Sequence, residues 1–285
     1  MSNRSPLAVT RVANSCVLLE IGGHAVLTDP FFTERWHLHA GEPFGLAVGD
    51  LPPLAAIVAS HSYPNHWDLR ALRRYPHKST TPVYVSSARM ARQARAIGFE
   101  QAEFLAWGQL RQPAPGLSIE AAPAGRTLWF RHNAYVIGGG GLSVFFGGEV
   151  RDPELLRRHR AGHPPVDVAL LPVNGLRAVV GPPIVMGPEQ AVDGTNALGA
   201  RVLVPVHDAH GDDDLLARVI RRHGTGADAA ALARAVASGP EVVNLPTGQR
   251  WTHLVPPDGS GPAGKRSSPA SPASLSAEDQ VADGA

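Results

Sequence analysis

The sequence predicts an α/β fold in which two β-sheets pack together and helices cover their outer faces. Short β-type runs separated by turn residues recur along the chain, and helix-type segments are interleaved with them, mainly in the second half. Because each sheet must bury an apolar face, few layer architectures suit this alternation, and a two-sheet sandwich with outer helices is one of them. A chain of 285 residues, 44% of them hydrophobic, can bury such a core.

The expected strands fall into two groups, one in each half of the chain. They span residues 8–11, 16–21, 24–28, 56–60, 83–86 and 117–121, and then 134–137, 142–146, 168–171, 202–206 and 241–245. The expected helices span residues 87–97, 188–198, 213–223 and 227–238, and the first two are followed by a glycine. Residues 138–141 are four glycines between two strands and predict a tight hairpin turn. Residues 256–285 are rich in Pro, Gly, Ser and Ala and predict a disordered tail behind one domain of residues 1–255.

Composition excludes several classes of partner. With 26 basic and 25 acidic residues, the net charge of +1 lacks the basic excess that nucleic-acid binding requires. No apolar stretch approaches the roughly 20 residues that span a bilayer, and the first residues lack the apolar core of a signal peptide. The single cysteine, Cys16, sits in an apolar run and is expected to be a buried, inert thiol. We therefore expect a cytoplasmic protein without integral membrane association.

Polar side chains follow three of the predicted strands, at the points where those strands end. The apolar run 54–60 leads directly into a loop with His61 and His66, the strand 142–146 is followed by Glu149, and the strand 202–206 is followed by His207 and Asp208. Strand ends fix the backbone while the loop side chains converge on a cleft. These residue types at three strand ends indicate a metal-binding site.

The ordered set of motifs resembles the metallo-β-lactamase superfamily, in the branch of the ascorbate-phosphate lactonases and N-acyl phosphatidylethanolamine phospholipase D. The resemblance covers residues 7–254, and it implies a four-layer αββα sandwich. The matching pieces span residues 14–21, 27–30, 61–68, 133–137, 146–149, 171–175, 188–191 and 204–207.

The resemblance also implies a ligand set, which this chain matches in part. The family signature is H-x-H-x-D-H, followed by a histidine on a later strand, a bridging Asp and a late His. His61 and His66 match the ends of the first motif, and His207 matches the late histidine. Non-matching residues occupy three positions, with Tyr63 in place of the second His, Asn65 in place of the Asp and Glu149 in place of the bridging Asp. The later-strand histidine belongs near residues 123–126, where none occurs, and His132 is expected to lie outside the site.

These differences predict at most a mononuclear centre. The first metal position of the family would retain only His61 and the bridging carboxylate, and we expect it to be empty. The second would retain His66, Glu149 and His207, with the amide oxygen of Asn65 beside them. Two imidazoles and one carboxylate are a sufficient ligand set for a catalytic divalent ion. Zinc is the expected ion, manganese is the alternative, and loss of all metal binding is the other outcome left open.

The function implied by the resemblance is hydrolysis of an ester, lactone or phosphodiester in a small-molecule substrate. Tyr63 is then expected to donate a hydrogen bond to a substrate oxygen, Asn65 to line the same mouth, and Asp208 or Glu149 to orient the attacking water. The alternative is a catalytically inactive protein of the same fold that binds a ligand or another protein.

Three further groups of polar residues are expected to have structural roles. Asp29 is interpreted as a turn carboxylate near the site, and the acidic run 212–214 as the N-terminus of a helix. His37 and His39 lie in the long segment 31–51, which is interpreted as a surface loop, with a lid over the cleft as the alternative.

Overall fold

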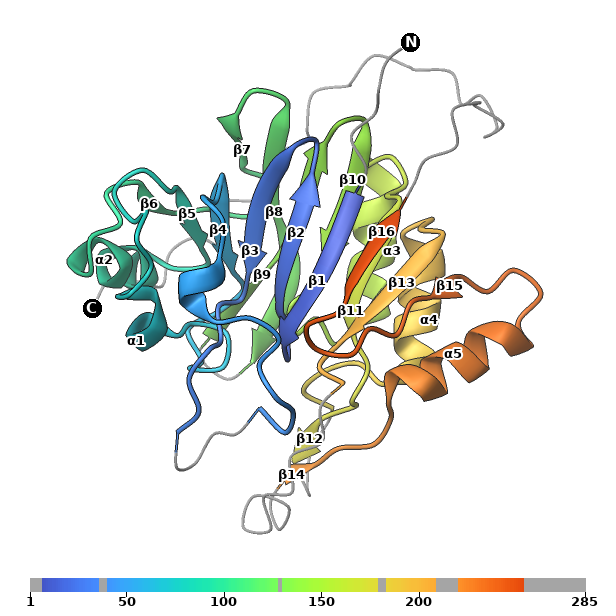
Figure 1. The fold of residues 1–285 in the computed structure, drawn as a ribbon. Helices are drawn as coiled ribbons and strands as arrows, with labels where there is room; N and C mark the ends of the chain where they lie inside the picture. The colour runs from blue at the N-terminus through green and yellow to red at the C-terminus, as the bar shows by residue number, and fades with distance from the viewer. Residues whose placement is uncertain (1–6, 36–39, 128–129, 179–182, 209–219, 254–285) are drawn as a thin grey trace. The chain divides into compact units, whose positions relative to one another are not determined.

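Two mixed β-sheets form the centre of the part of the chain that the structure describes (Figure 1). The structure is a computed structural model, which describes residues 7–35, 40–127, 130–178, 183–208 and 220–253. Contacts divide the chain into a unit of residues 1–254 and a unit of residues 255–285. The predicted tail of residues 256–285 lies outside the described residues.

The first sheet contains strands from both ends of the described chain. In spatial order its strands are β16 (Arg250–His253), β1 (Leu7–Ala13), β2 (Cys16–Ile21), β3 (His24–Thr28), β4 (Ala56–Ala59), β5 (Val83–Val85) and β6 (Ala102–Phe104). The pairs from β16 to β3 are antiparallel, and the pairs from β3 to β6 are parallel.

The second sheet is built from the middle of the chain. In spatial order its strands are β15 (Glu241–Val242), β13 (Val202–Val206), β11 (Val168–Pro172), β10 (Leu142–Phe146), β9 (Phe130–Gly139), β8 (Leu117–Thr127) and β7 (Leu110–Ala114). The pairs from β15 to β10 are parallel, and the pairs from β10 to β7 are antiparallel. A small antiparallel pair is formed by β12 (Arg177–Ala178) and β14 (Ile220–Arg221).

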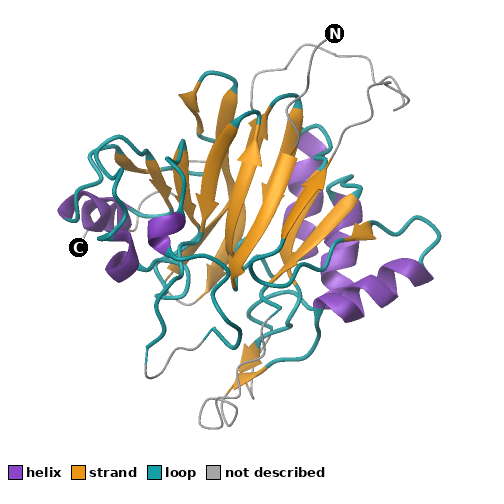
Figure 2. Ribbon diagram, viewed as in Figure 1, coloured by secondary structure: helices purple, strands orange, loops and turns teal. Residues whose placement is uncertain are grey.

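Helices cover the outer face of each sheet, which gives the predicted αββα layer order (Figure 2). The helices are α1 (Leu69–Leu72), α2 (Ala88–Ala96), α3 (Pro153–Gly162), α4 (Pro188–Ala197) and α5 (Gly226–Ala235), with one 3-10 turn, η1 (Val48–Asp50). Apolar residues of α1 and α2 pack into the core cluster of the first sheet, and those of α3, α4 and α5 into that of the second.

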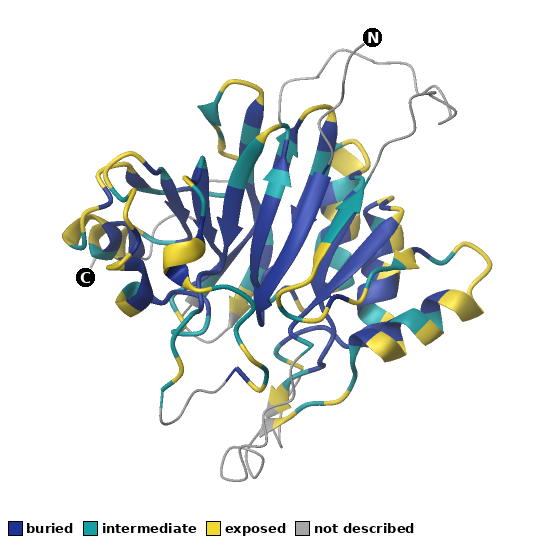
Figure 3. Ribbon diagram, in the orientation of Figure 1, coloured by how far each residue is buried: buried dark blue, intermediate teal, exposed yellow. Residues whose placement is uncertain are grey.

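The central parallel strands β4, β11 and β13 are buried along their whole length (Figure 3). This burial explains why β4, β11 and β13 are continuous apolar runs, since a strand covered on both faces has no solvent side for polar residues. Their carboxyl ends are the points at which the sequence places its polar loops.

Hydrogen bonds also tie the two sheets together near those strand ends. The hydroxyl of Tyr135 on β9 donates to the carbonyl oxygens of Ala59 and Tyr84, at 2.9 and 3.1 Å. The amide of Asn133 donates to the Ser60 carbonyl at 2.9 Å, and the Asn133 side chain donates to the Leu105 carbonyl. Because these bonds are buried, they fix the start of β9 against the end of β4.

Most of the predicted elements are confirmed, including the expected strands 16–21, 24–28, 142–146 and 202–206. The hairpin turn is also confirmed, because Gly139 pairs with Leu142 and both central glycines have positive φ. The predicted helix 213–223 is wrong at its end, where Ile220–Arg221 form β14, and its beginning lies outside the described residues. The acidic run 212–214 lies outside them as well.

Helix α3 was missed although its sequence carries two start signals. The Asp152 side chain accepts a hydrogen bond from the Glu154 amide, and Pro153 occupies the first turn, where it needs no hydrogen-bond donor. The segment has few apolar residues, so its helical period is weak, and burial of Leu156 and His159 against the sheet stabilises it instead.

The described part of segment 31–51 is mostly irregular and partly exposed, as expected of a surface loop, but several of its apolar residues pack on the first sheet. Val48 and Leu51 are buried, and the Phe44 ring meets Phe31 edge-on with 5.3 Å between centroids. Glu42 forms a 2.7 Å ion pair with Arg11, which is buried on β1. His37 and His39 lie outside the described residues.

Among the helices that the structure describes, none is long and apolar enough to cross a lipid bilayer.

The first prediction concerns His159 on α3, whose imidazole stacks on that of His163 and packs against Phe145. Burial, and then the neighbouring His163, lower the pKa of His159 to about 4. Histidine in an unfolded chain has a pKa of about 6.5, so the unfolded state takes up this proton first as the pH falls. We therefore expect this residue to reduce the free energy of unfolding progressively between about pH 6.5 and about pH 4.

Chemical denaturation of the wild type and of His159→Gln across this pH range tests the prediction. The variant does not titrate, so its unfolding free energy should fall less steeply with decreasing pH. His77→Gln, which changes an exposed histidine, is the matched control and should keep the wild-type slope. Parallel slopes for His159→Gln and the wild type would contradict the prediction.

Candidate metal centre

The loop after β4 is organised by a buried carboxylate, that of Asp29 at the end of β3. Asp29 Oδ1 accepts a hydrogen bond from the Ser60 amide at 2.6 Å, and Asp29 Oδ2 lies 2.6 Å from both Ser60 Oγ and His66 Nδ1. Asp29 and His66 are fully buried. Because a carboxylate bound to one imidazole nitrogen leaves the other nitrogen facing away, His66 presents Nε2 to the interior of the site. The expected structural turn carboxylate therefore directly orients a candidate metal ligand.

The same carboxylate orients His61 through Ser60. An ionised Asp29 can only accept, so the Ser60 hydroxyl gives its single proton to Asp29 Oδ2. Ser60 Oγ then accepts from His61 Nδ1, at 2.9 Å. This tautomer, inferred from the hydrogen-bond network, leaves the lone pair of His61 Nε2 available for a metal.

His207 is held at the end of β13 by an unusual backbone turn. Its φ is +53°, and its amide donates to the carbonyl of Asn14, whose φ is +54°. The Asn14 amide in turn donates to Glu42 Oε1 at 3.0 Å, in the ion pair with Arg11. Among the described non-glycine residues, only these two and Asp29 have positive φ. Backbone strain of this kind persists where the surroundings enforce it, and here it is concentrated around the site.

Glu149 reaches the site because glycine precedes it. Gly148 has a φ of +57°, and a Cβ at this position would lie 2.6 Å from the Cβ of Ser60. A side chain there would push the loop after β10 away from β4. The glycine therefore allows close approach of the two sheets at the point where Glu149 faces the histidines.

His132 lies inside the site, and the expectation that it lies outside is wrong. Its ring stacks on that of His61, with 4.2 Å between centroids and 12° between planes, and the residue is 2% exposed. The resemblance places a histidine on the strand that carries residues 123–126. In the structure, His132 lies on the next strand, where it pairs with Gly125.

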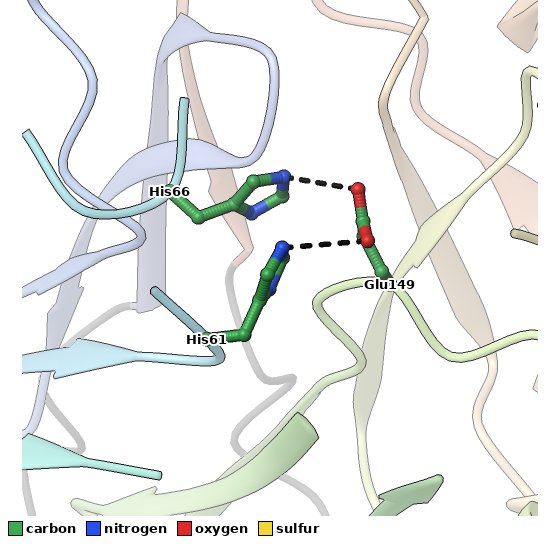
Figure 4. A group of neighbouring side chains, drawn as sticks. All are labelled: His61, His66 and Glu149. Carbon is green, nitrogen blue, oxygen red and sulfur yellow. Dashed lines mark ion pairs between the residues drawn. The ribbon is translucent and has the colours of Figure 1, made fainter. Parts of the chain in front are cut away.

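Four imidazoles surround the single carboxylate of Glu149, two for each oxygen. Figure 4 shows His61 and His66 pointing at different oxygens of this carboxylate. Oε1 lies 3.2 Å from His66 Nε2 and 3.6 Å from His207 Nε2, whereas Oε2 lies 3.4 Å from His61 Nε2 and 3.9 Å from His132 Nδ1. The four residues that the sequence predicts as metal ligands thus lie together, with His132 beside them, and the ligand atoms of His61, His66 and Glu149 lie within 4.8 Å of one another.

The spacing fits ligands of a shared ion better than it fits hydrogen bonds. Charge-assisted hydrogen bonds between nitrogen and a carboxylate oxygen are usually 2.7–2.9 Å long, which is shorter than all four separations. Two ligands of a tetrahedral zinc ion, each bound at about 2.1 Å, lie about 3.4 Å apart. The separations at Oε1 lie close to this value on either side. His132 is the loosest of the four.

Unpartnered atoms point to the same conclusion. Of the described side-chain atoms that are buried without a hydrogen-bond partner, three lie at the site: His66 Nε2, His207 Nε2 and Asn65 Oδ1. Buried polar atoms rarely remain unpaired, because each loses its water without compensation. These three belong to the residues that the sequence assigns to the second metal position, so the donor set fits a divalent cation there.

The charges in the site also suit a cation. Burial lowers the pKa of His66, but the carboxylates of Asp29 and Glu149 outweigh it and raise the pKa to about 9. Burial and the charge on His66 lower the pKa of His207 to about 3, and they hold the pKa of His61 well below its usual range. Burial raises the pKa of Glu149, whereas His61 and His66 bring it well below its usual range.

Burial likewise lowers the pKa of His132. Neutral imidazoles and an ionised carboxylate are the protonation states that metal ligands require, and only His66 would have to release a proton on binding.

The three predicted catalytic residues lie in different surroundings. Tyr63 is 54% exposed, with its ring centroid 6.4 Å from that of His61. Asn65 turns its Oδ1 into the protein. Asp208 Oδ1 accepts a 2.6 Å hydrogen bond from the Gly226 amide at the start of α5, which is a structural contact. A water-orienting role for Asp208 therefore stays a prediction.

Sequence reasoning missed the roles of Ser60 and Asn14 as well as His132. Ser60 and Asn14 carry no ligand signal of their own, because each acts by binding a neighbouring group. The sequence did carry a signal for His132. If the predicted strands 117–121 and 134–137 are paired as an antiparallel hairpin, and the first is extended forward and the second backward, His132 lies opposite residues 123–126.

Comparison with known proteins agrees with this geometry. The model of the family described as a beta-lactamase superfamily domain matches residues 24–207, which include both histidines of the loop, Glu149 and His207. An uncharacterised protein of Mycobacterium tuberculosis is 31% identical over 228 residues, covering 71% of this chain and 59% of that protein. The chain thus spans 59% of the length of this relative.

A UPF0173 metal-dependent hydrolase of Opitutus terrae is 27% identical over 214 residues, covering 70% of this chain and 84% of that protein. Among solved structures, the metallo-β-lactamase fold protein YhfI of Bacillus subtilis superposes with a TM-score of 0.61 and 16% identity. The superposition covers 87% of this chain and 99% of YhfI, and it supports the fold alone. Because the family model matches more than half of the sequence, this chain belongs to the beta-lactamase superfamily, and it has the metallo-β-lactamase fold.

Proposed function

We propose that this chain is a metal-dependent hydrolase whose metal centre is built around the carboxylate of Glu149. The observation that carries the proposal is the convergence of buried imidazoles on both oxygens of one buried, ionised carboxylate. The metal-dependent hydrolases among the relatives support the same class of reaction.

His66, His207 and Glu149 would hold one divalent ion, with the Asn65 oxygen beside it. Zinc is the proposed ion, and manganese is the alternative. A bound ion would lower the pKa of a water molecule and polarise the bond to be cleaved. Asp29 fixes His66 in the required orientation, and the Asn14 turn fixes His207.

The substrate class is proposed from the branch that the sequence resembles, namely a small molecule with an ester, lactone or phosphodiester bond. The exposed phenol of Tyr63 is placed to donate a hydrogen bond to a substrate oxygen at the mouth of the site. Glu149 is the proposed water-orienting group, because its carboxylate faces the ligand atoms directly. The competing hypothesis, an inactive binding protein of the same fold, predicts a ligand-binding cleft without metal.

The second prediction is that protein purified without chelator and supplied with zinc or manganese holds at least about one ion per chain. His207→Ala should lower the metal content by about one ion and weaken its binding by more than about 100-fold, since outer partners alone are worth 10–100-fold. Hydrolysis of bis(p-nitrophenyl) phosphate, p-nitrophenyl acetate and a γ-lactone should fall with it.

Elemental analysis by mass spectrometry measures the metal content, and His24→Ala is the control, since His24 contacts the Pro115 carbonyl instead. A metal content near zero in the wild type would exclude the hydrolase and favour the binding protein. In that case His66→Ala should leave ligand affinity almost unchanged.

The third prediction concerns Asp29→Asn. The asparagine tolerates the left-handed backbone but cannot accept all the hydrogen bonds that Asp29 receives from Ser60 and His66. We expect metal affinity to fall about 10–100-fold, which is the usual cost of removing an outer partner of a ligand. Competition with a chromophoric chelator measures the change.

Asp68→Asn is the matched control for this variant. Asp68 is also a buried carboxylate in the same region, but it accepts from the amides of Ala71 and Phe32 and orients no candidate ligand. We expect wild-type metal affinity for this control. Equal affinities for the wild type and Asp29→Asn would show that the carboxylate does not orient His66.

A further inference from the structure

Positive charge is concentrated in a stretch of the chain that has no acidic residue. Residues 69–99 contain seven of the 26 Lys and Arg residues and no Asp or Glu, although the whole chain has a net charge of only +1. This stretch forms α1, β5, α2 and the turns between them. The acidic residues that flank it are Asp68, which is buried at the start of α1, and Glu100. The small net charge of the chain therefore conceals a strongly basic segment.

Helices α1 and α2 lie next to each other on the outer side of the first sheet (Figure 1). Just before α1, the indole Nε1 of Trp67 donates a 3.1 Å hydrogen bond to Gln93 Oε1 on α2. Just after the two helices, the rings of Tyr75 and Phe99 stack, with 6.3 Å between centroids and 8° between planes. These contacts hold both helices against the same apolar core, so their outer sides belong to one surface.

Arginines occupy the outer sides of both helices. On α2, the buried residues Met90, Ala91 and Ala94 face the core, so Arg89 and Arg92 lie on the opposite side of the helix. Figure 3 shows the outer sides of α1 and α2 exposed. We call the exposed set the arginine patch, and it consists of Arg70, Arg73, Arg74, Arg89 and Arg92.

No carboxylate of the described residues forms an ion pair with the arginine patch. Helix α3 on the second sheet differs, because its exposed Arg157 pairs with Glu154 and Asp193, and its Arg158 pairs with Glu154. Like charges three residues apart on a helix, such as those of Arg89 and Arg92, repel each other and destabilise the helix. An anionic partner would offset this repulsion.

We propose that the arginine patch binds the surface of a membrane that contains anionic lipids. Clusters of about four to eight Lys and Arg residues on one surface are typical of such binding. A guanidinium group can pair with a phosphate through two parallel hydrogen bonds. Lipid headgroups diffuse within the membrane, so they can meet arginines that have no regular spacing. This inference goes beyond the proposed function and does not rest on the metal centre.

The exposed side chains of the patch favour a membrane over a single-stranded nucleic acid. Proteins that bind single strands combine cations with exposed aromatic rings on which the bases stack. Among the described residues, the large apolar side chains that are exposed are those of Tyr63, Leu110 and Val236, and none of these belongs to α1 or α2. Arginines without exposed aromatic rings suit the phosphates of a lipid surface.

Sedimentation of the full chain with sucrose-loaded vesicles tests the proposal. We expect binding to vesicles of an equimolar mixture of phosphatidylglycerol and phosphatidylcholine, and no binding to vesicles of phosphatidylcholine alone. Binding should weaken as the salt concentration rises from about 0.01 M to about 0.15 M, because the Debye length falls from about 30 Å to about 8 Å. Equal sedimentation with both kinds of vesicle, or with neither kind at low salt, would overturn the proposal.

Two double variants remove charge from α1 and α2 separately. Arg73→Gln with Arg74→Gln, and Arg89→Gln with Arg92→Gln, should each weaken binding to the anionic vesicles about 25-fold, because each arginine near an anionic surface contributes about fivefold. Glutamine has nearly the helix propensity of arginine, so both variants should keep their helices, which circular dichroism checks. Wild-type affinity in both variants would overturn the role of the patch.

The matched control removes the same charge from the other side of the protein. Arg157→Gln with Arg158→Gln changes two exposed arginines of α3 and should leave vesicle affinity at the wild-type value. An equal loss in this control would show that net charge, rather than the patch, governs binding.

Duplex DNA is the competing ligand, because its phosphates also attract cations without base stacking. We expect a duplex oligonucleotide of random sequence to bind more weakly than the anionic vesicles at equal phosphate concentration. Tighter binding of the duplex, weakened by the same double variants, would show that the partner is a nucleic acid and would overturn the membrane proposal. His207→Ala should bind the vesicles as the wild type does, so this result is independent of the proposed hydrolase.

Discussion

The hydrogen bonds of the buried Asp29 carboxylate are the interaction on which the rest of the site depends. They fix the amide and hydroxyl of Ser60 and the Nδ1 atom of His66, and through Ser60 they set the tautomer of His61. Asp29 thus orients both His66, which faces Oε1 of Glu149, and His61, which faces Oε2. Burying a carboxylate costs free energy unless its oxygens accept hydrogen bonds, so the hydrogen bonds to Asp29 depend on one another.

The strained backbone and close packing around the site serve the same arrangement. Asn14, Asp29 and His207 adopt left-handed conformations that L-residues rarely occupy, and Gly148 lies where no side chain fits. Each of these backbone conformations brings a polar group to the edge where β4 of one sheet meets β10 and β13 of the other. The apolar strands β4 and β13, which lead into the site, are buried along their whole length.

The fold and the candidate ligands at the strand ends could be predicted from local sequence. Parallel strands buried on both faces are uninterrupted apolar runs, so β4 and β13 were visible and so were His61 and His207 immediately after them. Helix α3 and strand β14 were not, because short or weakly periodic segments take their structure from the sheet on which they pack. The sequence shows Tyr63 and Asn65 at two positions where the family signature has His and Asp, but it does not show which side chains lie beside the remaining histidines.

His132 shows the difference between what the sequence determined and what only the tertiary structure decided. The sequence by itself determined the superfamily, the layer order and a candidate ligand set of His61, His66, Glu149 and His207, since each depends on residues close together in the chain or in a fixed order. Only the tertiary structure decided that His132 lies beside them, because its position follows from a shifted hairpin register. It also decided that Glu149 presents one oxygen to each pair of imidazoles, since the direction of a side chain depends on the packing of both sheets around it.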